Sequence, residues 1–209
     1  MIVLARHGQS VANAEGRLVG RADSPLTDLG RLQAARTGEW LAQAARPPGG
    51  PPAMLLCSPL SRTRGTAGAI ADAYRAELGQ SPEVLVDDRL VELDYGALDL
   101  QELGTVPAGT WSAWRSDPAY RPPGGETLLE LASRVQALLE EVAPVATDRE
   151  VVAVTHVSPI KAAAAWALGV GVEVSWRLSL PVAAISRISI GRTGPALLSF
   201  GETAHLGAG

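Results

Sequence analysis

Cysteine is nearly absent from this sequence. Cys57 is the single cysteine among the 209 residues, so a disulfide within the chain is excluded. It ends an apolar run, and we therefore expect a small buried core residue there rather than a nucleophile. A chain without internal disulfides suits a reducing compartment, and we expect a cytoplasmic protein.

Charge and long apolar runs are scarce as well. Charged residues make up 19% of the chain and the formal net charge is −4, so neither nucleic acid nor an anionic membrane is expected as a partner. The longest apolar run, residues 162–172, is shorter than the roughly 20 residues of a membrane span. The first residues hold no basic segment followed by a long apolar one, so we expect no secretory signal. None of these features excludes a homodimer.

Short apolar segments alternate with helical patterns along the chain. Hydrophobic residues make up 46% of the sequence, enough for a substantial core. The patterns predict strands at 2–5, 53–57, 84–86, 151–154, 183–190 and 196–200, and helices at 28–45, 58–78, from 127 onward, and at 159–168. Strands that alternate with helices indicate an α/β fold. We expect a three-layer α/β/α sandwich with a mostly parallel central sheet that carries an antiparallel edge strand.

Two threonines mark helix starts. Thr27 precedes a helical pattern and is the expected N-cap. Thr127 is followed three residues later by Glu130, which is the spacing of a capping box. Apolar residues then recur at helical spacing as far as Val142, so a helix with one apolar face is predicted there.

The stretches between these elements bear on domain organisation. Residues 9–25 read as a polar loop, and residues 47–52, all Pro or Gly, read as a surface loop within one domain rather than a boundary. Residues 87–123 are rich in Gly, Pro and Trp and lack a regular pattern. Long insertions of this kind are usually functional loops or lids. We expect one domain over residues 1–209 with a lid-like insertion around 97–123.

Charged and imidazole side chains follow three of the predicted strands. Arg6 and His7 come directly after the first strand, Arg62 follows the second, and His156 follows the strand at 151–154. The carboxyl ends of parallel strands lie along one edge of a sheet, where α/β proteins bind ligands. These side chains would therefore surround one crevice. Guanidinium groups match phosphate oxygens with paired hydrogen bonds, and a neutral imidazole beside them could attack phosphorus.

Plainer interpretations compete with this one. A single histidine at a strand end is more often structural than catalytic, and a single arginine is usually a solvated surface charge. His7 and His156 could also bind a metal ion with Glu92 as a third ligand. Two guanidinium groups in the same pocket would repel a divalent cation, however, and the sequence has no His-x-x-x-His or Cys-x-x-Cys spacing. We expect neither a metal nor a cofactor.

Six motifs occur in order along nearly the whole chain. They lie at residues 4–13, 23–30, 58–67, 90–96, 123–127 and 154–156. The first reads Leu-Ala-Arg-His-Gly-Gln-Ser and is followed by Asn13, and the fourth reads Leu-Val-Glu-Leu-Asp-Tyr-Gly. The set resembles the histidine phosphatase superfamily, also called the phosphoglycerate mutase-like family. His-Val-Ser-Pro-Ile-Lys at residues 156–161 is similar to the branch of bacterial acid phosphatases and α-ribazole phosphatases.

The resemblance implies a role for each matching residue. His7 would be the nucleophile that becomes phosphohistidine, and Arg6, Arg62 and His156 would form the phosphate pocket. Glu92 would protonate the leaving oxygen as a general acid and then activate water as a base. Because such a carboxyl group must stay partly protonated, we expect Glu92 to be partly buried.

Further residues follow from the same resemblance. Asn13, Ser58 and Val157 would contact the substrate. Asp94 and Asp99 compete with Glu92 for the role of the acid, although only Glu92 matches the motif position. Gly8 would let the loop after the first strand turn close to the ligand.

The resemblance leaves three functions to weigh. Phosphoglycerate mutases resemble this chain but are longer, and they carry a cation directly after the acid, where this chain has Leu93, and a paired Arg-Arg that it lacks. We therefore expect a phosphomonoester hydrolase acting on a small-molecule phosphate ester, with a cofactor-dependent phosphoglycerate mutase as the alternative. The complete set of site residues speaks against a non-catalytic phosphate-ester binder. Trp111 and Trp114 could stack on the leaving group or only pack the lid, and Lys161 could line the pocket rim or face solvent.

Overall fold

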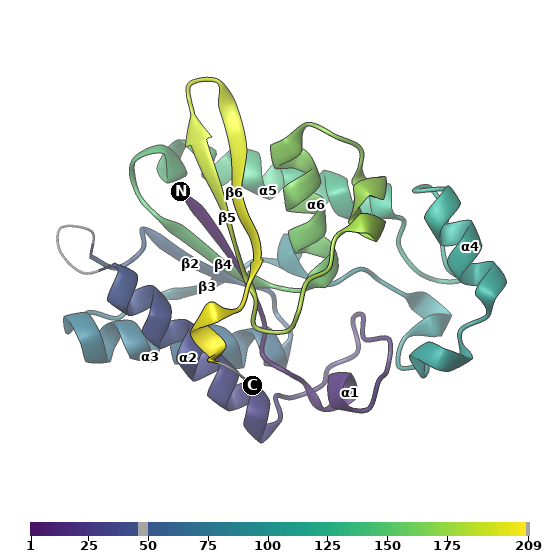
Figure 1. The fold of residues 1–209 in the computed structure, drawn as a ribbon, viewed down its shortest axis with the longest axis horizontal. Helices are drawn as coiled ribbons and strands as arrows, with labels where there is room; N and C mark the ends of the chain where they lie inside the picture. Colours follow the sequence, from purple (N-terminus) through teal and green to yellow (C-terminus); the bar gives the residue numbers. More distant parts are fainter. Residues whose placement is uncertain (46–49, 208–209) are drawn as a thin grey trace.

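The computed structural model describes residues 1–45 and 50–207. Within these ranges, six strands form one sheet in the order β3-β2-β4-β1-β5-β6 (Figure 1). The strands are β1 (Ile2–Arg6), β2 (Met54–Cys57), β3 (Val84–Val86), β4 (Val151–Thr155), β5 (Ile185–Gly191) and β6 (Gly194–Glu202). Every predicted strand is confirmed, with ends that differ by a few residues.

The sheet is parallel over four strands and antiparallel over the last two. β1 pairs with β4, β4 with β2 and β2 with β3, all in parallel. β5 runs antiparallel to β1, and β6 runs antiparallel to β5 at the edge of the sheet. The expected mostly parallel sheet with an antiparallel edge is confirmed.

Helices cover both faces of the sheet, because β1 carries apolar side chains on both of its faces. They are α2 (Asp28–Ala44), α3 (Ser61–Leu78), α5 (Leu128–Asp148) and α6 (Val157–Leu168). Successive side chains of a strand point to opposite faces. Ile2 and Leu4 belong to the apolar core shared with α5 and α6, whereas Val3 and Ala5 belong to the core shared with α2 and α3. Figure 1 shows the two helix pairs on opposite sides of the sheet, and the three-layer sandwich is confirmed.

Both predicted helix caps are present. The Thr27 side chain accepts a hydrogen bond of 3.0 Å from the N–H of Gly30 at the start of α2. At the start of α5, Thr127 accepts from the N–H of Glu130, and the Glu130 carboxylate accepts from the N–H of Thr127 at 2.9 Å. Cys57 is buried and free, as its apolar surroundings predict.

Short helices lie where the sequence predicts irregular chain. The loop at 9–25 contains α1 (Val11–Ala14), and the stretch at 87–123 contains α4 (Ala108–Ser116). The prediction missed α4 because the helix has nine residues, and its apolar contacts come chiefly from Trp111 and Trp114, one turn apart. The remaining turns of 3₁₀ helix are η1 (Asp88–Leu90), η2 (Gly96–Leu98), η3 (Leu103–Thr105), η4 (Val172–Arg177) and η5 (Ala204–Leu206).

Two expectations concern particular segments. Residues 46–49, which overlap the predicted surface loop at 47–52, lie outside the described residues. In the described part of the chain, no helix combines the length and the apolar character that crossing a membrane requires.

Candidate active site

The ends of three neighbouring strands bring the predicted residues together. The parallel register sets the last residue of β1 beside the last residue of β4, and β2 lies on the other side of β4. His7 follows β1 and His156 follows β4, and their ring centroids lie 5.0 Å apart. Arg62 belongs to the first turn of α3, which begins shortly after β2. The predicted side chains therefore lie together at the strand ends.

His7 is buried and held in one tautomer. Its Nδ1 lies 2.7 Å from the carbonyl oxygen of Gly8. Because a carbonyl oxygen can only accept, Nδ1 carries the hydrogen and Nε2 keeps its lone pair. Burial lowers the pKa of His7 well below its ordinary value, and the charges of Arg6 and Arg62 lower it further. The imidazole is neutral as a result, which is the form that nucleophilic attack requires.

His156 caps the N-terminus of α6 and faces His7. Its Nε2 lies 2.8 Å from the hydroxyl oxygen of Ser58. Its Nδ1 is buried and, among the described residues, has no hydrogen-bond partner. Burial lowers the pKa of His156 well below its ordinary value, and the nearby His7 and Arg62 add to this effect. Ser58 thus holds one ring nitrogen, and the other is available to a ligand.

The two arginines are held by backbone carbonyl groups. Arg62 is fully buried, and its two terminal nitrogens donate to the carbonyl oxygens of Gly20 at 2.7 Å and Ala22 at 3.0 Å. Arg6 donates to the carbonyl oxygen of Leu180. The Nε of each arginine is buried and unpartnered within the described residues. A buried cation without a paired anion is unfavourable, so this arrangement favours the binding of an anion.

Gly8 has a role that differs from the predicted one. Its φ angle is not in the left-handed region, so the turn itself does not require glycine. A Cβ atom at Gly8 would instead lie 2.2 Å from the carbonyl oxygen of Gly30, at the start of α2. The absence of a side chain lets the loop after β1 pack directly on the backbone of α2.

Glu92 is buried, more completely than expected, and lies between a loop and a helix terminus. One carboxylate oxygen accepts hydrogen bonds from the N–H of Leu93 at 2.7 Å and from the N–H of Ser158 at 3.2 Å. Ser158 lies in the first turn of α6, two residues after His156. Burial raises the pKa of Glu92, although the N–H of Leu93, the side chain of Ser158 and both site arginines oppose the shift.

The two competing carboxylates bind backbone elsewhere. Asp94 accepts from the N–H of Gly96 at 2.9 Å, and it lies 3.5 Å from the Arg21 guanidinium. Asp99 accepts from the N–H of Gly20 at 2.7 Å and from the N–H of Ala22 at 2.8 Å. Asp99 therefore fixes the same loop whose carbonyl oxygens hold Arg62.

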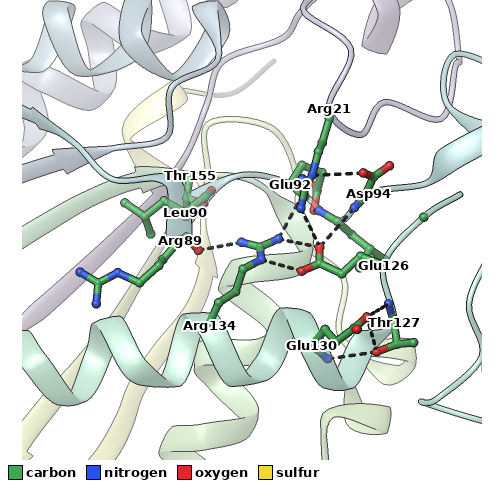
Figure 2. A network of polar contacts seen from close by, with 12 residues as sticks. Arg21, Arg89, Leu90, Glu92, Asp94, Glu126, Thr127, Glu130, Arg134 and Thr155 are labelled. Atoms are coloured by element: carbon green, nitrogen blue, oxygen red, sulfur yellow. Dashed lines mark hydrogen bonds and ion pairs between the residues drawn. The ribbon is translucent and has the colours of Figure 1, made fainter.

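An ion pair on α5 supports the segment that carries Glu92. Arg134 binds both oxygens of Glu126, at 2.8 and 2.9 Å. It also donates to the carbonyl oxygens of Arg89 at 2.7 Å and Glu92 at 3.2 Å. In Figure 2 the Arg134 side chain points from the helix toward this segment, and Thr155 binds the carbonyl oxygen of Leu90 from β4. The backbone on both sides of Glu92 is thereby held.

Two predicted substrate contacts lie at the edges of this arrangement. The Asn13 side-chain oxygen accepts from the N–H and the hydroxyl of Ser10 as part of the cap of α1. Val157 is the first residue of α6 and lines a cavity beside Glu92. Their roles toward substrate stay predictions.

Several residues of the site were not predicted. Ser158, Arg134 and Glu126 act through backbone groups or through a pair of charges eight residues apart, and no sequence spacing marks such contacts. One available signal was the arginine inside the apolar pattern of α5, since a charge among core positions needs a partner. Within the described residues, no group of three or more His, Cys, Asp or Glu side chains is arranged to hold a metal ion.

Comparison with known proteins extends over almost the whole chain. Residues 2–203 match the histidine phosphatase superfamily, branch 1. A probable phosphoglycerate mutase of Proteus mirabilis is 31% identical over 98% of this chain and 94% of its own length. A glucosyl-3-phosphoglycerate phosphatase of Mycolicibacterium vanbaalenii is 35% identical over 82% of this chain and 76% of its own length. Among solved structures, a mycobacterial glucosyl-3-phosphoglycerate phosphatase in complex with VO3 superposes with a TM-score of 0.84, at 27% identity, covering 97% of this chain and 99% of its own.

Proposed function

Since the chain belongs to branch 1 of the histidine phosphatase superfamily, we propose that it hydrolyses small phosphomonoesters through a phosphohistidine on His7. One observation carries the proposal. Arg62 is buried and Arg6 half-buried beside a neutral His7, and their hydrogen-bond partners in the described chain are carbonyl oxygens, with both Nε groups unpartnered. A phosphate group would supply the missing negative charge and accept these hydrogen bonds.

The first step transfers the phosphoryl group to the enzyme. The lone pair of His7 Nε2 attacks phosphorus, the N–P bond forms, and the bond from phosphorus to the leaving oxygen breaks. Arg6, Arg62 and the free Nδ1 of His156 stabilise the charge on the non-bridging oxygens. Glu92 gives its proton to the leaving oxygen, so the alcohol departs neutral.

The second step returns the enzyme to its starting state. Glu92, now a carboxylate, takes a proton from water, and the water oxygen attacks phosphorus. The N–P bond breaks, inorganic phosphate leaves, and His7 is again neutral. The raised pKa of Glu92 suits the protonated form needed in the first step, which supports an enzyme of the acid phosphatase type. Asp99 binds the loop at Gly20 and Asp94 binds Gly96, whereas Glu92 binds the first turn of the helix that follows His156, which supports Glu92 in this role.

A cofactor-dependent phosphoglycerate mutase is the second candidate, favoured by the similarity to the Proteus mirabilis protein. The test is a panel of p-nitrophenyl phosphate, phosphoserine, 3-phosphoglycerate and glucosyl-3-phosphoglycerate, with and without 2,3-bisphosphoglycerate. We expect release of inorganic phosphate from several esters without the bisphosphate, and complete loss of release in His7→Ala. Interconversion of phosphoglycerates that depends on the bisphosphate and releases no phosphate would establish the mutase instead.

Arg62 offers a matched pair of variants for the same assay. Arg62→Ala removes a buried guanidinium and should abolish most of the phosphate release. Arg64→Ala removes an exposed arginine from the same turn of α3 and should leave the release unchanged. Equal activity of the two variants would contradict the proposed phosphate pocket.

A further inference from the structure

A cavity lies next to the segment that carries Glu92 and to the first turn of α6. Its volume is about 280 Å³, and its lining includes Leu93 and Ser158. Those are the two residues whose N–H groups bind Glu92. Under the proposed function, the leaving oxygen of the ester must lie against Glu92 to receive its proton. The rest of the leaving group would then extend into this cavity.

One wall of the cavity is aromatic. It contains Trp111 and Trp114 from α4, Trp176 from η4, and Tyr95. The rings of Trp111 and Trp114 are stacked with centroids 5.9 Å apart, and Trp176 meets each of them at 6.3 and 6.0 Å. Such a wall suits a flat or cyclic group, because aromatic faces gain most from contact with another ring or an apolar face.

The polar atoms of this wall are turned away from the cavity. The indole Nε1 atoms of Trp114 and Trp176 and the hydroxyl of Ser175 are buried, and none has a hydrogen-bond partner in the described chain. The wall therefore offers a ligand chiefly the apolar faces of its rings.

Lys161 adds a positive charge to this cavity. It lies on α6 one turn after Ser158, so both side chains line the cavity from the same face of the helix. Lys161 forms no ion pair with any described residue and is partly buried. Burial lowers the pKa of Lys161, and the charge of Glu92 opposes this shift. An anionic group on the ligand would be attracted to this ammonium group.

We propose that this cavity is the leaving-group subsite, and that it selects a cyclic leaving group that carries a carboxylate. The ring lies against the three tryptophans, and the carboxylate binds Lys161. The proposal rests on the proposed phosphatase function. It assigns to α4, and so to the insertion around 97–123, the recognition of the alcohol part of the ester.

The test compares esters that differ only in the group facing Lys161. Suitable esters are benzyl phosphate, 4-carboxybenzyl phosphate and 4-carbamoylbenzyl phosphate. In all three a methylene group separates the ring from the leaving oxygen, so the ring substituent has little effect on the basicity of that oxygen. We expect kcat/KM for the carboxylate ester to exceed that for the amide by about tenfold, as a charged hydrogen bond would give. Lys161→Met should bring the ratio of kcat/KM for the carboxylate and amide esters close to one, whereas Lys161→Arg should keep the preference.

Binding to an inactive variant separates this proposal from the proposed function. Calorimetric titration of His7→Ala with the three esters reports the subsite without turnover. Tighter binding of the carboxylate ester, lost in the double variant with Lys161→Met, supports the subsite even if no ester is hydrolysed. Equal affinity for the carboxylate and amide esters would overturn it, even if wild-type protein hydrolyses all three. Trp111→Leu should weaken binding of benzyl phosphate but not of ethyl phosphate, and equal weakening of both would contradict the aromatic wall.

Discussion

Arg62 and Asp99 hold the same short loop through complementary groups. Arg62 donates to the carbonyl oxygens of Gly20 and Ala22, and Asp99 accepts from the N–H groups of these same two residues. The loop is therefore fixed by four hydrogen bonds, and it fixes the Arg62 guanidinium in turn. Under the proposed function, Asp99 would be a positioning residue, since it holds Arg62 through the loop and would not itself contact the phosphate group.

Asp99→Asn should weaken phosphate binding more than it slows turnover. An asparagine side chain has a single acceptor oxygen, so one of the two N–H groups would lose its partner. Because Arg62 depends on the loop, we expect the inhibition constant of inorganic phosphate to rise roughly threefold to tenfold, the equivalent of one hydrogen bond. Asp72→Asn is the control, since Asp72 is exposed on α3 and pairs with Arg75 instead of a residue of this loop. An equal effect of both variants would argue against the link through the loop.

Arg134→Lys should disturb the acid rather than the nucleophile. A lysine keeps the charge beside Glu126 but cannot bind both of its oxygens and two carbonyl groups at once. We expect turnover of an alkyl phosphate to fall about tenfold, which is the size expected for the loss of one hydrogen bond to a charged group. The loss for p-nitrophenyl phosphate should be much smaller, because its leaving group needs no proton. The ratio of the two rates distinguishes this effect from a general loss of folded protein.

The control for this prediction is Arg89→Lys. Arg89 makes a forked contact with Asp87 and a single hydrogen bond to Glu141 of α5. This variant therefore disturbs an arginine that contacts the same helix without releasing the carbonyl groups around Glu92. Its ratio of alkyl to nitrophenyl turnover should match that of the wild type. If the ratio changed in Arg89→Lys and not in Arg134→Lys, the segment of Glu92 would be supported by Arg89, and the prediction for Arg134 would be wrong.

Activity toward alkyl phosphates should be highest at acidic pH. His7 must be neutral to attack, and its lowered pKa keeps it neutral at a pH where an ordinary histidine is protonated. Glu92 must be protonated to assist the leaving group, and activity is lost as pH rises through its raised pKa. In Glu92→Gln, the alkaline decline of alkyl phosphate turnover should disappear together with most of the rate. Ionisation of the substrate affects both proteins alike and cancels in the comparison.

Glu92→Gln should also accumulate phosphohistidine when given an activated ester, because His7 can still attack while water is no longer activated. Mass spectrometry of the quenched protein measures the adduct. Accumulation in Asp94→Asn or Asp99→Asn instead would move the acid and base role to that residue.

Thr127→Ala should destabilise the whole fold without altering the site chemistry directly. The threonine and Glu130 satisfy each other's N–H groups at the start of α5, and loss of such a cap costs about 1 kcal/mol. Urea unfolding measures the change in the free energy of unfolding. Thr147→Ala, at an exposed position near the other end of α5, should change it far less. Equal losses would show that the cap contributes nothing.

The sequence predicts the parts of the fold whose cause is local. β4 is a run of buried apolar residues, and the cap of α5 follows from two side chains three positions apart, so both could be read in advance. The placement of His7 and His156 at adjacent strand ends follows from parallel pairing. Helix α4 has a weak local signal, since Trp114 is buried through contacts with Tyr95 and Trp176, which are distant in the chain. The reason for glycine at Gly8 is likewise the backbone of another helix.

Supporting residues were harder to predict than those of the crevice. His7 and Glu92 belong to contiguous motifs, whereas Arg134 acts on carbonyl groups more than forty positions away in the chain. Every residue has a backbone carbonyl group, so the amino-acid type of the partner does not reveal such a contact. Contacts of this kind are visible only in the folded chain.

Helix α6 fixes the spacing between His156 and Lys161. Under the proposed function, His156 at its N-cap contacts the phosphate group, and Lys161 lies five positions further along the same helix. A rise of about 1.5 Å per residue separates these positions by roughly 7.5 Å along the helix axis. A rigid helix cannot shorten or stretch that interval. Substrates would therefore be sorted by the spacing between their phosphate and their second anionic group, and an ester with the right groups at the wrong spacing would engage only one end.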